Sequence, residues 1–378
     1  MKKSTNRGLM LAFVIIFSGI LVACSDTSST STSTSKLGKL LFTLGGDLGE
    51  VNEVSWSPDG SLVALSGNKN KCTVWDATTG KELYSYSGNN ASVGEVHVAW
   101  SPNGKMLAAS TSQHSGVFAT IDILNPLTGN VIMQLGEGIT GGSPHAMRWS
   151  PDSKVLATSE YSTINIWNMA NGTLITSLEC GASPIDNIVW AANGYTMMSL
   201  TWENAILWRP VLGEKLFTFT GHTQGLTGGD LSADGARIFT ASWDATGIIW
   251  DASTGLKTST MTGHTSTIYD VAVSPDGQRI ATVSGDKRGI IWDAATGAKL
   301  LVLNGHSSFA RSASWCSDSR RVATGTWQTA YVWDVVDQKK LYTLGGHEKT
   351  VTKISWNPDG KRIVTASDDG TAKIWNVE

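Results

Sequence analysis

Short runs of alternating apolar and polar residues, separated by tight turns, recur through most of the chain. Residues 268–273 (IYDVAV) alternate as a half-buried strand does, and the Pro-Asp-Gly that follows them forms a tight turn, because Pro presets φ and Gly accepts positive φ. Further strands are expected at 279–283, 289–292 and 299–303. The pattern predicts four antiparallel strands in about 42 residues, leaves no room for a helix, and indicates an all-β fold.

This unit recurs eight times. A position near the end of the third strand is occupied in turn by Trp75, Leu124, Trp167, Trp208, Trp250, Trp292, Trp333 and Trp375. The intervals are 41 to 43 residues, except for 49 between the first two positions. A second ladder, about 19 residues earlier in each unit, contains Trp56, Trp100, Trp149, Trp190, Leu231, Val273, Trp315 and Trp356. A period near 42 is typical of propeller blades.

The units resemble WD40 repeats. The last four carry a Gly-His pair, with histidines His222, His264, His306 and His347 lying 27 or 28 residues before the ladder Trp. The resemblance covers residues 38–378 and implies a WD40-type β-propeller. Eight ladder positions predict eight four-stranded blades, and the 49-residue interval leaves seven blades as the alternative. The first four units lack the Gly-His pair.

The two ends of the chain predict how the ring closes. The sequence stops at Glu378, directly after the third strand of the last unit. Residues 41–46 (LFTLGG) closely match residues 341–346 (LYTLGG), which form a fourth strand leading into a next unit. We therefore expect the N-terminal segment to supply the missing strand of the last blade, which removes an open sheet edge.

The first 37 residues have a different character. Lys2, Lys3 and Arg7 precede an apolar stretch at 9–23 that is shorter than the roughly 20 residues of a membrane-spanning helix, as in a secretory signal. Residues 21–24 (LVAC) resemble the bacterial lipobox, which implies a lipid on Cys24; the alternative is an ordinary signal peptide with an incidental cysteine. The predicted organisation is a signal peptide at 1–23, a lipidated Ser/Thr-rich flexible tether at 24–37 and the propeller at 38–378. It predicts a protein of the bacterial cell envelope, held by its lipid on the extracytoplasmic side of a membrane.

Composition excludes several functions. Without the first 24 residues the chain has 26 basic and 32 acidic residues, so we expect no nucleic acid partner. The four cysteines, at positions 24, 72, 180 and 316, imply no disulfide framework, and no spacing of Cys and His indicates a metal site. We expect no cofactor and a monomer.

A His, a Ser, an Asp and a Trp recur in register in three units. They are His222, Ser242, Asp244 and Trp250; His264, Ser284, Asp286 and Trp292; and His347, Ser367, Asp369 and Trp375. A Ser-His-Asp set is also the composition of a hydrolase triad, but a triad occurs once per site. The WD40 resemblance implies a structural hydrogen-bond network within each blade. In the seventh unit, Gln328 stands near the position of the expected Asp, so we expect an altered network there.

Three of the 16 tryptophans fall outside the two ladders: Trp202, Trp243 and Trp327. Each lies between the second and third strands of its unit, and Tyr161 has a similar place. In WD40 proteins this turn opens on the face that receives partners, so these four residues are candidate partner contacts. The alternative is that they pack between blades.

Three classes of function compete. The first is a membrane-tethered scaffold that binds a protein or peptide partner. The second is a small-molecule or glycan binder that uses the central channel or an aromatic pocket. The third is a propeller enzyme, for which Glu53, Glu95 and Asp270 on the innermost strands are candidate acids. We expect the first class and no catalysis, because the recurring residues serve the scaffold.

Overall fold

The computed structural model describes residues 36–45, 47–87, 96–111, 120–136, 144 and 146–378. Residues 35–378 form one compact unit. The described part consists of β-strands and a single 3-10 turn, η1 (Pro210–Leu212), and it contains no helix long and apolar enough to cross a membrane. The all-β prediction is therefore confirmed. The signal peptide and Cys24 lie outside the described residues.

Six separate sheets each contain four antiparallel strands. The first three are made of β3 (Val51–Trp56), β4 (Leu62–Gly67), β5 (Cys72–Asp76) and β6 (Glu82–Tyr86); β7 (Val98–Trp100), β8 (Leu107–Thr111), β9 (Thr120–Leu124) and β10 (Val131–Leu135); and β11 (Met147–Trp149), β12 (Val155–Glu160), β13 (Thr163–Asn168) and β14 (Thr173–Glu179). The next three are made of β15 (Ile185–Trp190), β16 (Met197–Thr201), β17 (Ala205–Arg209) and β18 (Glu214–Phe219); β19 (Leu226–Leu231), β20 (Arg237–Ser242), β21 (Thr246–Asp251) and β22 (Lys257–Thr262); and β23 (Ile268–Val273), β24 (Arg279–Ser284), β25 (Gly289–Asp293) and β26 (Lys299–Leu303).

The remaining strands form one larger sheet because a single long strand serves two units. Its members are β27 (Ser312–Trp315), β28 (Arg321–Gly325), β29 (Trp327–Asp334), β30 (Lys339–Trp356), β31 (Arg362–Ser367), β32 (Thr371–Asn376), β2 (Lys39–Gly45) and β1 (Lys36–Leu37). The first part of β30 pairs with β29, and its last six residues pair with β31. The described strands thus make eight four-stranded groups, numbered here as sheets 1 to 8 in chain order.

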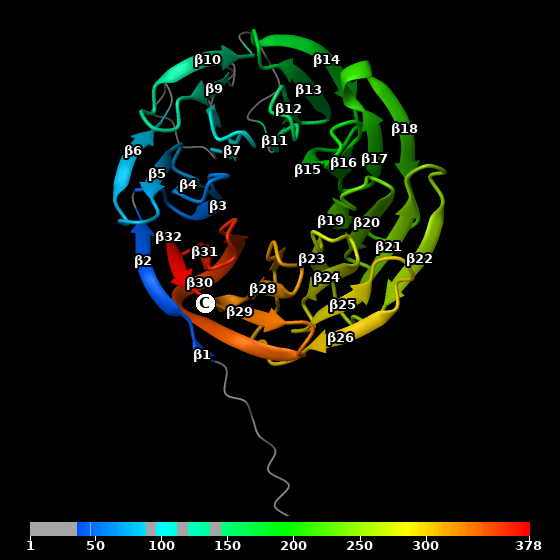
Figure 1. Ribbon diagram of the computed structural model, residues 1–378. Coiled ribbons are helices and arrows are strands. Elements are labelled where there is room, and N and C mark those ends of the chain that lie inside the picture. Colours follow the sequence, from blue (N-terminus) through cyan, green and yellow to red (C-terminus); the bar gives the residue numbers. More distant parts are fainter. Residues whose placement is uncertain (1–35, 46, 88–95, 112–119, 137–143, 145) are drawn as a thin grey trace, which may run out of the picture. The chain divides into compact units, whose positions relative to one another are not determined.

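The sheets of the compact unit follow one another around a central opening (Figure 1). The first strand of each sheet lies nearest the opening and the fourth lies at the outer rim (Figure 1). All four strands expected in residues 268–303 are present, as β23 to β26. The β-propeller architecture predicted from the repeats is confirmed.

The N-terminal strand closes the ring. β2 pairs antiparallel with β32, so that Leu44 lies opposite Ala372 and Lys39 opposite Asn376. Leu44 is fully buried in the core between sheet 8 and sheet 1. Lys36–Leu37, which the sequence placed in the tether, form β1 and pair parallel with β30.

Both tryptophan ladders lie in the core, where they have different roles. Indoles of the second ladder donate to a backbone carbonyl on the inner strand of the preceding sheet, as Trp100 does to Ser55 (3.2 Å) and Trp149 to Ala99 (2.9 Å). Trp56 joins sheet 1 to sheet 8 in the same way, through the carbonyl of Ser355 (3.1 Å). These bonds tie adjacent sheets together near the opening.

Candidate interaction face

The recurring His, Asp and Trp residues lie in one chain of hydrogen bonds in each of sheets 5, 6 and 8. In sheet 6, His264 Nδ1 is 2.9 Å from Asp286 Oδ2 and its Nε2 is 2.8 Å from Thr282 Oγ1, which also accepts the Trp292 indole N–H at 2.8 Å. Sheets 5 and 8 repeat this arrangement with His222, Asp244 and Trp250 and with His347, Asp369 and Trp375.

The residue between His and Trp is a threonine, which the sequence reasoning missed. It is Thr240, Thr282 or Thr365, always 18 residues after the His and 10 before the Trp. Ser242 and Ser284 have a different role: each accepts the backbone N–H of the Asp and donates to a carbonyl of the preceding turn. Ser367 accepts from Asp369 in the same way. With its Ser outside the His–Thr–Trp chain, the set does not have the order of a catalytic triad.

Sheets 3, 4 and 7 keep the hydrogen bond of the ladder Trp but have no Asp at the other end of the chain. Their ladder indoles donate to Thr158, Ser199 and Thr324 at 2.9 Å, and the two residues are nine apart rather than ten. The turn between the second and third strands is therefore one residue shorter and holds no Asp. Tyr161 and Trp202 lie in this turn instead, and Trp327 stands at its end as the first residue of β29. That one-residue difference in spacing was visible in the sequence.

Sheet 7 has the His without its acid. His306 Nε2 lies 2.8 Å from Thr324 Oγ1, while its buried Nδ1 has no partner among the described residues. Burial lowers the pKa of His306 to about 4, and the positive charge of Lys340 acts in the same direction. The sequence expectation of an altered network in this unit agrees with this geometry.

The four candidate aromatic residues are all about half exposed: Tyr161 54%, Trp202 46%, Trp243 48% and Trp327 45%. Trp202 and Trp243 come from adjacent sheets and meet edge to face, with ring centroids 5.0 Å apart and an interplanar angle of 73°. Gly225 allows this contact, because a Cβ there would lie 2.2 Å from the Trp202 ring.

These turns lie at one end of the central opening. The backbone carbonyls of Tyr161 and Trp202 accept the N–H groups of Ile185 and Leu226, which begin the inner strands of the next sheets. Thr326, next to Trp327, accepts from Val351 in the same way. The residues that follow, such as Asp186, Thr227 and Lys353, line a cavity of about 280 Å³ in the opening. The aromatic turns and the cavity mouth therefore share one face, which we call the channel face.

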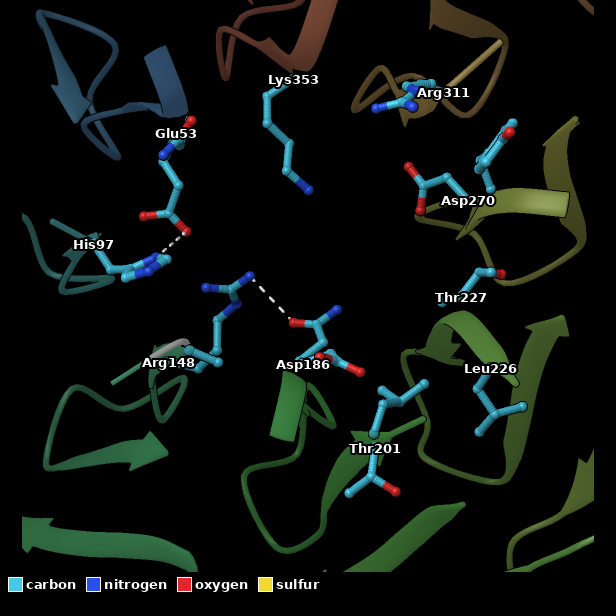
Figure 2. A pocket seen from close by; sticks show the side chains of 16 residues that line it. Glu53, His97, Arg148, Asp186, Thr201, Leu226, Thr227, Asp270, Arg311 and Lys353 are labelled. Atoms are coloured by element: carbon cyan, nitrogen blue, oxygen red, sulfur yellow. Dashed lines mark hydrogen bonds and ion pairs between the residues drawn. The ribbon is translucent and has the colours of Figure 1, made fainter. Parts of the chain in front are cut away.

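The cavity is lined mostly by charged and polar side chains (Figure 2). Lys353 and Arg148 extend into it from different sheets, and Glu53, Asp186, Asp270 and Arg311 also line it (Figure 2). Glu53 is 3.4 Å from His97 Nδ1, and Arg148 donates to the side-chain oxygen of Asn187 at 3.3 Å.

The candidate catalytic acids join adjacent sheets. Glu53 accepts the backbone N–H of Val98 at 2.9 Å, and Asp270 accepts that of Ala313 at 3.0 Å. Asp230, which the sequence reasoning did not single out, accepts that of Val273 at 2.8 Å. In each case the donor lies on the inner strand of the next sheet. Glu95 lies outside the described residues.

The pKa values of these acids diverge with their surroundings. Burial works against the charge of Glu53, but the hydrogen bond and charge of His97, together with Arg148, lower its pKa to about 2. Burial raises the pKa of Asp230 to about 6, with a smaller contribution from Asp270. Burial also raises the pKa of Asp270.

Cysteines and metal ligands give no further site in the described part of the chain. Cys72, Cys180 and Cys316 are buried free thiols. Among the described residues, no group of three or more His, Cys, Asp or Glu side chains has the geometry to hold a metal ion.

Comparison with known protein families assigns the repeats to a family. The family model for the WD domain, G-beta repeat, matches residues 136–168, 213–251, 255–293, 297–334 and 338–376. The model for the anaphase-promoting complex subunit 4 WD40 domain matches residues 37–98. The fold and these matches define a β-propeller made of sequence repeats. The chain is a WD40-repeat protein.

Individual relatives are distant. The B-type cell cycle switch protein ccs52B of Medicago truncatula is 26% identical over 263 residues, which are 57% of this chain and 52% of that protein. The small ribosomal subunit protein RACK1 of Neurospora crassa is 33% identical over 119 residues, 29% of this chain and 34% of its own length. The chain thus spans about half the length of the first of these relatives and a third of the second. The crystal structure of the computationally designed Ika8 protein is similar in fold, with a TM-score of 0.77 at 21% identity over 90% of this chain and 100% of that one.

Proposed function

We propose that this protein is a non-catalytic interaction platform that binds a protein or peptide partner on its channel face. The observation that carries the proposal is the placement of four half-exposed aromatic side chains on the face that also holds the cavity mouth. Aromatic residues anchor interfaces because they bury a large area and lose few rotamers. In sheets 3, 4 and 7 the aromatic stands in a turn that has no Asp, so the turn contributes no His–Asp pair to the scaffold.

The names of the relatives support binding to other proteins. One matched relative is described as a cofactor of the APC complex, and another as a small ribosomal subunit protein. Both descriptions concern proteins that act within larger assemblies. We carry over to this chain only the use of a propeller as a binding platform.

The proposal includes a location. A lipid on Cys24 would hold the propeller on the extracytoplasmic side of a bacterial membrane, with the Ser/Thr-rich segment as the tether. A Cys24→Ser variant expressed in a bacterium should move from the membrane fraction to the soluble fraction and lose incorporation of labelled fatty acid. Incorporation equal to wild type would rule out Cys24 as the lipidated residue.

The geometry favours binding over catalysis. Glu53 and Asp270 are held by backbone N–H groups of the next sheet. A small-molecule ligand remains the second candidate, because the polar cavity of about 280 Å³ can hold one.

The platform is tested by affinity purification from detergent-solubilised membranes of the producing cells. Full-length wild type is compared with Trp243→Ala/Trp327→Ala and with Tyr195→Ala. Tyr195 is 77% exposed and lies in the turn between the first two strands of sheet 4, at the other end of the strands. Both variants are first checked for the same unfolding midpoint as wild type.

We expect one protein to be recovered by wild type and by Tyr195→Ala and to be lost with the double variant. Equal recovery by all three would exclude the aromatic turns as the binding site. If wild type enriches nothing, the platform proposal fails and small ligands of the cavity become the first candidates.

A further inference from the structure

Arg311 at the cavity mouth is a positioned cation without an anion. Its guanidinium lies over the rings of Tyr269 and Phe309, 5.4 Å from each centroid. The two rings are themselves 6.2 Å apart. Arg311 is exposed and forms no ion pair with any residue that the structure describes. Two flanking aromatic rings restrict the rotamers of the guanidinium and leave its N–H edge open.

A second cation faces the same opening. The side chain of Lys353 on β30 extends into the cavity (Figure 2) and, like Arg311, has no ion pair within 4.0 Å among the described residues. Lys353 does lower the pKa of the buried Asp270 through its charge, but it is not in contact with that carboxylate. Arg148 is different, since its guanidinium donates to the carbonyl of Met147 and to Asn187. Arg311 and Lys353 are therefore the cations with capacity for an external anion.

The Glu53 and Asp270 carboxylates of the cavity already accept hydrogen bonds from the protein. Glu53 accepts from Val98 and is paired with His97, while Asp270 accepts from Ala313 and Val271. Their negative charge still limits what can enter. A polyanion such as nucleic acid, or a phosphate with nearly two charges, meets Glu53, Asp186 and Asp270 in the same opening. A single carboxylate fits the fork of a guanidinium with the least repulsion.

From these observations we propose that the channel face recognises a peptide through the side-chain carboxylate of an Asp or Glu residue, held by Arg311 with Lys353 beside it. The inference rests on the proposed function and specifies the partner. Trp327 lies close to Arg311 in the same sheet. The backbone N–H of Arg311 donates to the carbonyl of Gly325, two residues before Trp327. An apolar residue next to the carboxylate can therefore pack on Trp327.

The test uses full-length protein in detergent and fluorescence anisotropy with labelled octapeptide pools. One pool has a fixed glutamate at its fourth position among neutral residues, and the matched pool has glutamine there. We expect wild type to bind the glutamate pool at least about tenfold more tightly, as a charge-assisted fork contact implies. Raising the salt concentration should reduce the difference.

Variants assign the contact. Arg311→Gln should abolish the preference for glutamate, and Arg311→Lys should keep only part of it, because lysine retains the charge and loses the fork. Arg209→Gln is the matched control, since Arg209 is an exposed arginine at the end of β17 whose partner is Glu214. It should leave the preference intact.

Equal affinity for the two pools would overturn the inference, as would loss of the preference in Arg209→Gln. Displacement by inorganic phosphate but not by glutarate at the same concentration would also overturn it, because the anion would then be phosphate. The failures are distinguishable. Suppose that the Trp243→Ala/Trp327→Ala variant loses the captured protein but wild type binds the two peptide pools with equal affinity. The platform proposal would then hold, and only the carboxylate recognition would be rejected.

Discussion

Trp202 and Trp243 meet edge to face across the boundary between sheets 4 and 5, with ring centroids 5.0 Å apart. The two residues are in contact although they do not occupy equivalent positions in their repeats. Trp202 lies in the short turn of sheet 4, and Trp243 lies in the longer turn of sheet 5 that also contains Asp244. An edge-to-face pair fixes both rings while about half of each side chain stays exposed. The pair is therefore a preorganised apolar surface on the channel face.

Gly225 controls the position of this pair. In Gly225→Ala the new Cβ would lie 2.2 Å from the Trp202 ring, so the indole must move. We expect a change in the near-ultraviolet circular dichroism of the tryptophans and a loss of partner recovery similar to that of Trp202→Ala. Gly277→Ala is a control of a different kind: it has open space around its Cβ but a φ of +67°. It should lower stability and leave the tryptophan signal unchanged.

Sequence periodicity was sufficient for the architecture because each unit repeats the same strands and turns. The matching segments at 41–46 and 341–346 also predicted the closure by β2. Thr240, Thr282 and Thr365 were missed for a physical reason. A threonine in a strand is an ordinary β-former, and only the side-chain geometry shows that its hydroxyl joins the His to the Trp. The two cavity cations, Arg311 and Lys353, were missed because they lie in different repeats and only the folded ring brings them to one cavity.

The His–Asp networks should contribute strongly to stability. Asp369 accepts hydrogen bonds from His347 (2.8 Å), from the backbone of Glu348 (2.9 Å) and from Thr371. Asp369→Ala leaves these donors unpaired, and we expect a loss of roughly 3 kcal/mol in the free energy of unfolding. Urea denaturation measures it. Glu348→Ala, an exposed change next to His347 in β30, should cost less than about 0.5 kcal/mol. Equal costs would show that the network contributes little.

Ring closure predicts a contrast within one strand. Leu44 is fully buried, whereas Leu40, on the same strand β2, is 44% exposed. Leu44→Ala leaves a cavity between sheets 8 and 1 and should lower the free energy of unfolding by about 3 kcal/mol. Leu40→Ala should cost about 1 kcal/mol or less. If both variants unfold at the wild-type urea concentration, β2 does not hold the ring closed.

The burial of His306 without an acidic partner among the described residues leads to a prediction of how stability depends on pH. Its pKa falls from 6.5 in the unfolded chain to about 4 in the folded protein, because burial disfavours the charged ring. Between these values the unfolded state binds more protons than the folded state. The free energy of unfolding therefore decreases as the pH falls from 6.5 to 4, and this loss is absent above pH 6.5. The effect is about 3 kcal/mol at most for this one group. Burial also lowers the pKa values of His222, His264 and His347, which add in the same direction.

The histidines can be separated by substitution. His306→Gln removes the titrating ring and keeps an amide that can reach Thr324, so the fall in stability between pH 6.5 and 4 should become shallower. Asp369 and Glu53 also lose stabilisation as the pH falls, but at lower pH: because their folded pKa values are about 2, the loss begins only below their unfolded values of 3.8 and 4.5. Urea unfolding at several pH values, for wild type and His306→Gln, separates the two windows. An unchanged slope between pH 6.5 and 4 in the variant would show that His306 is protonated as readily in the folded state as in the unfolded one.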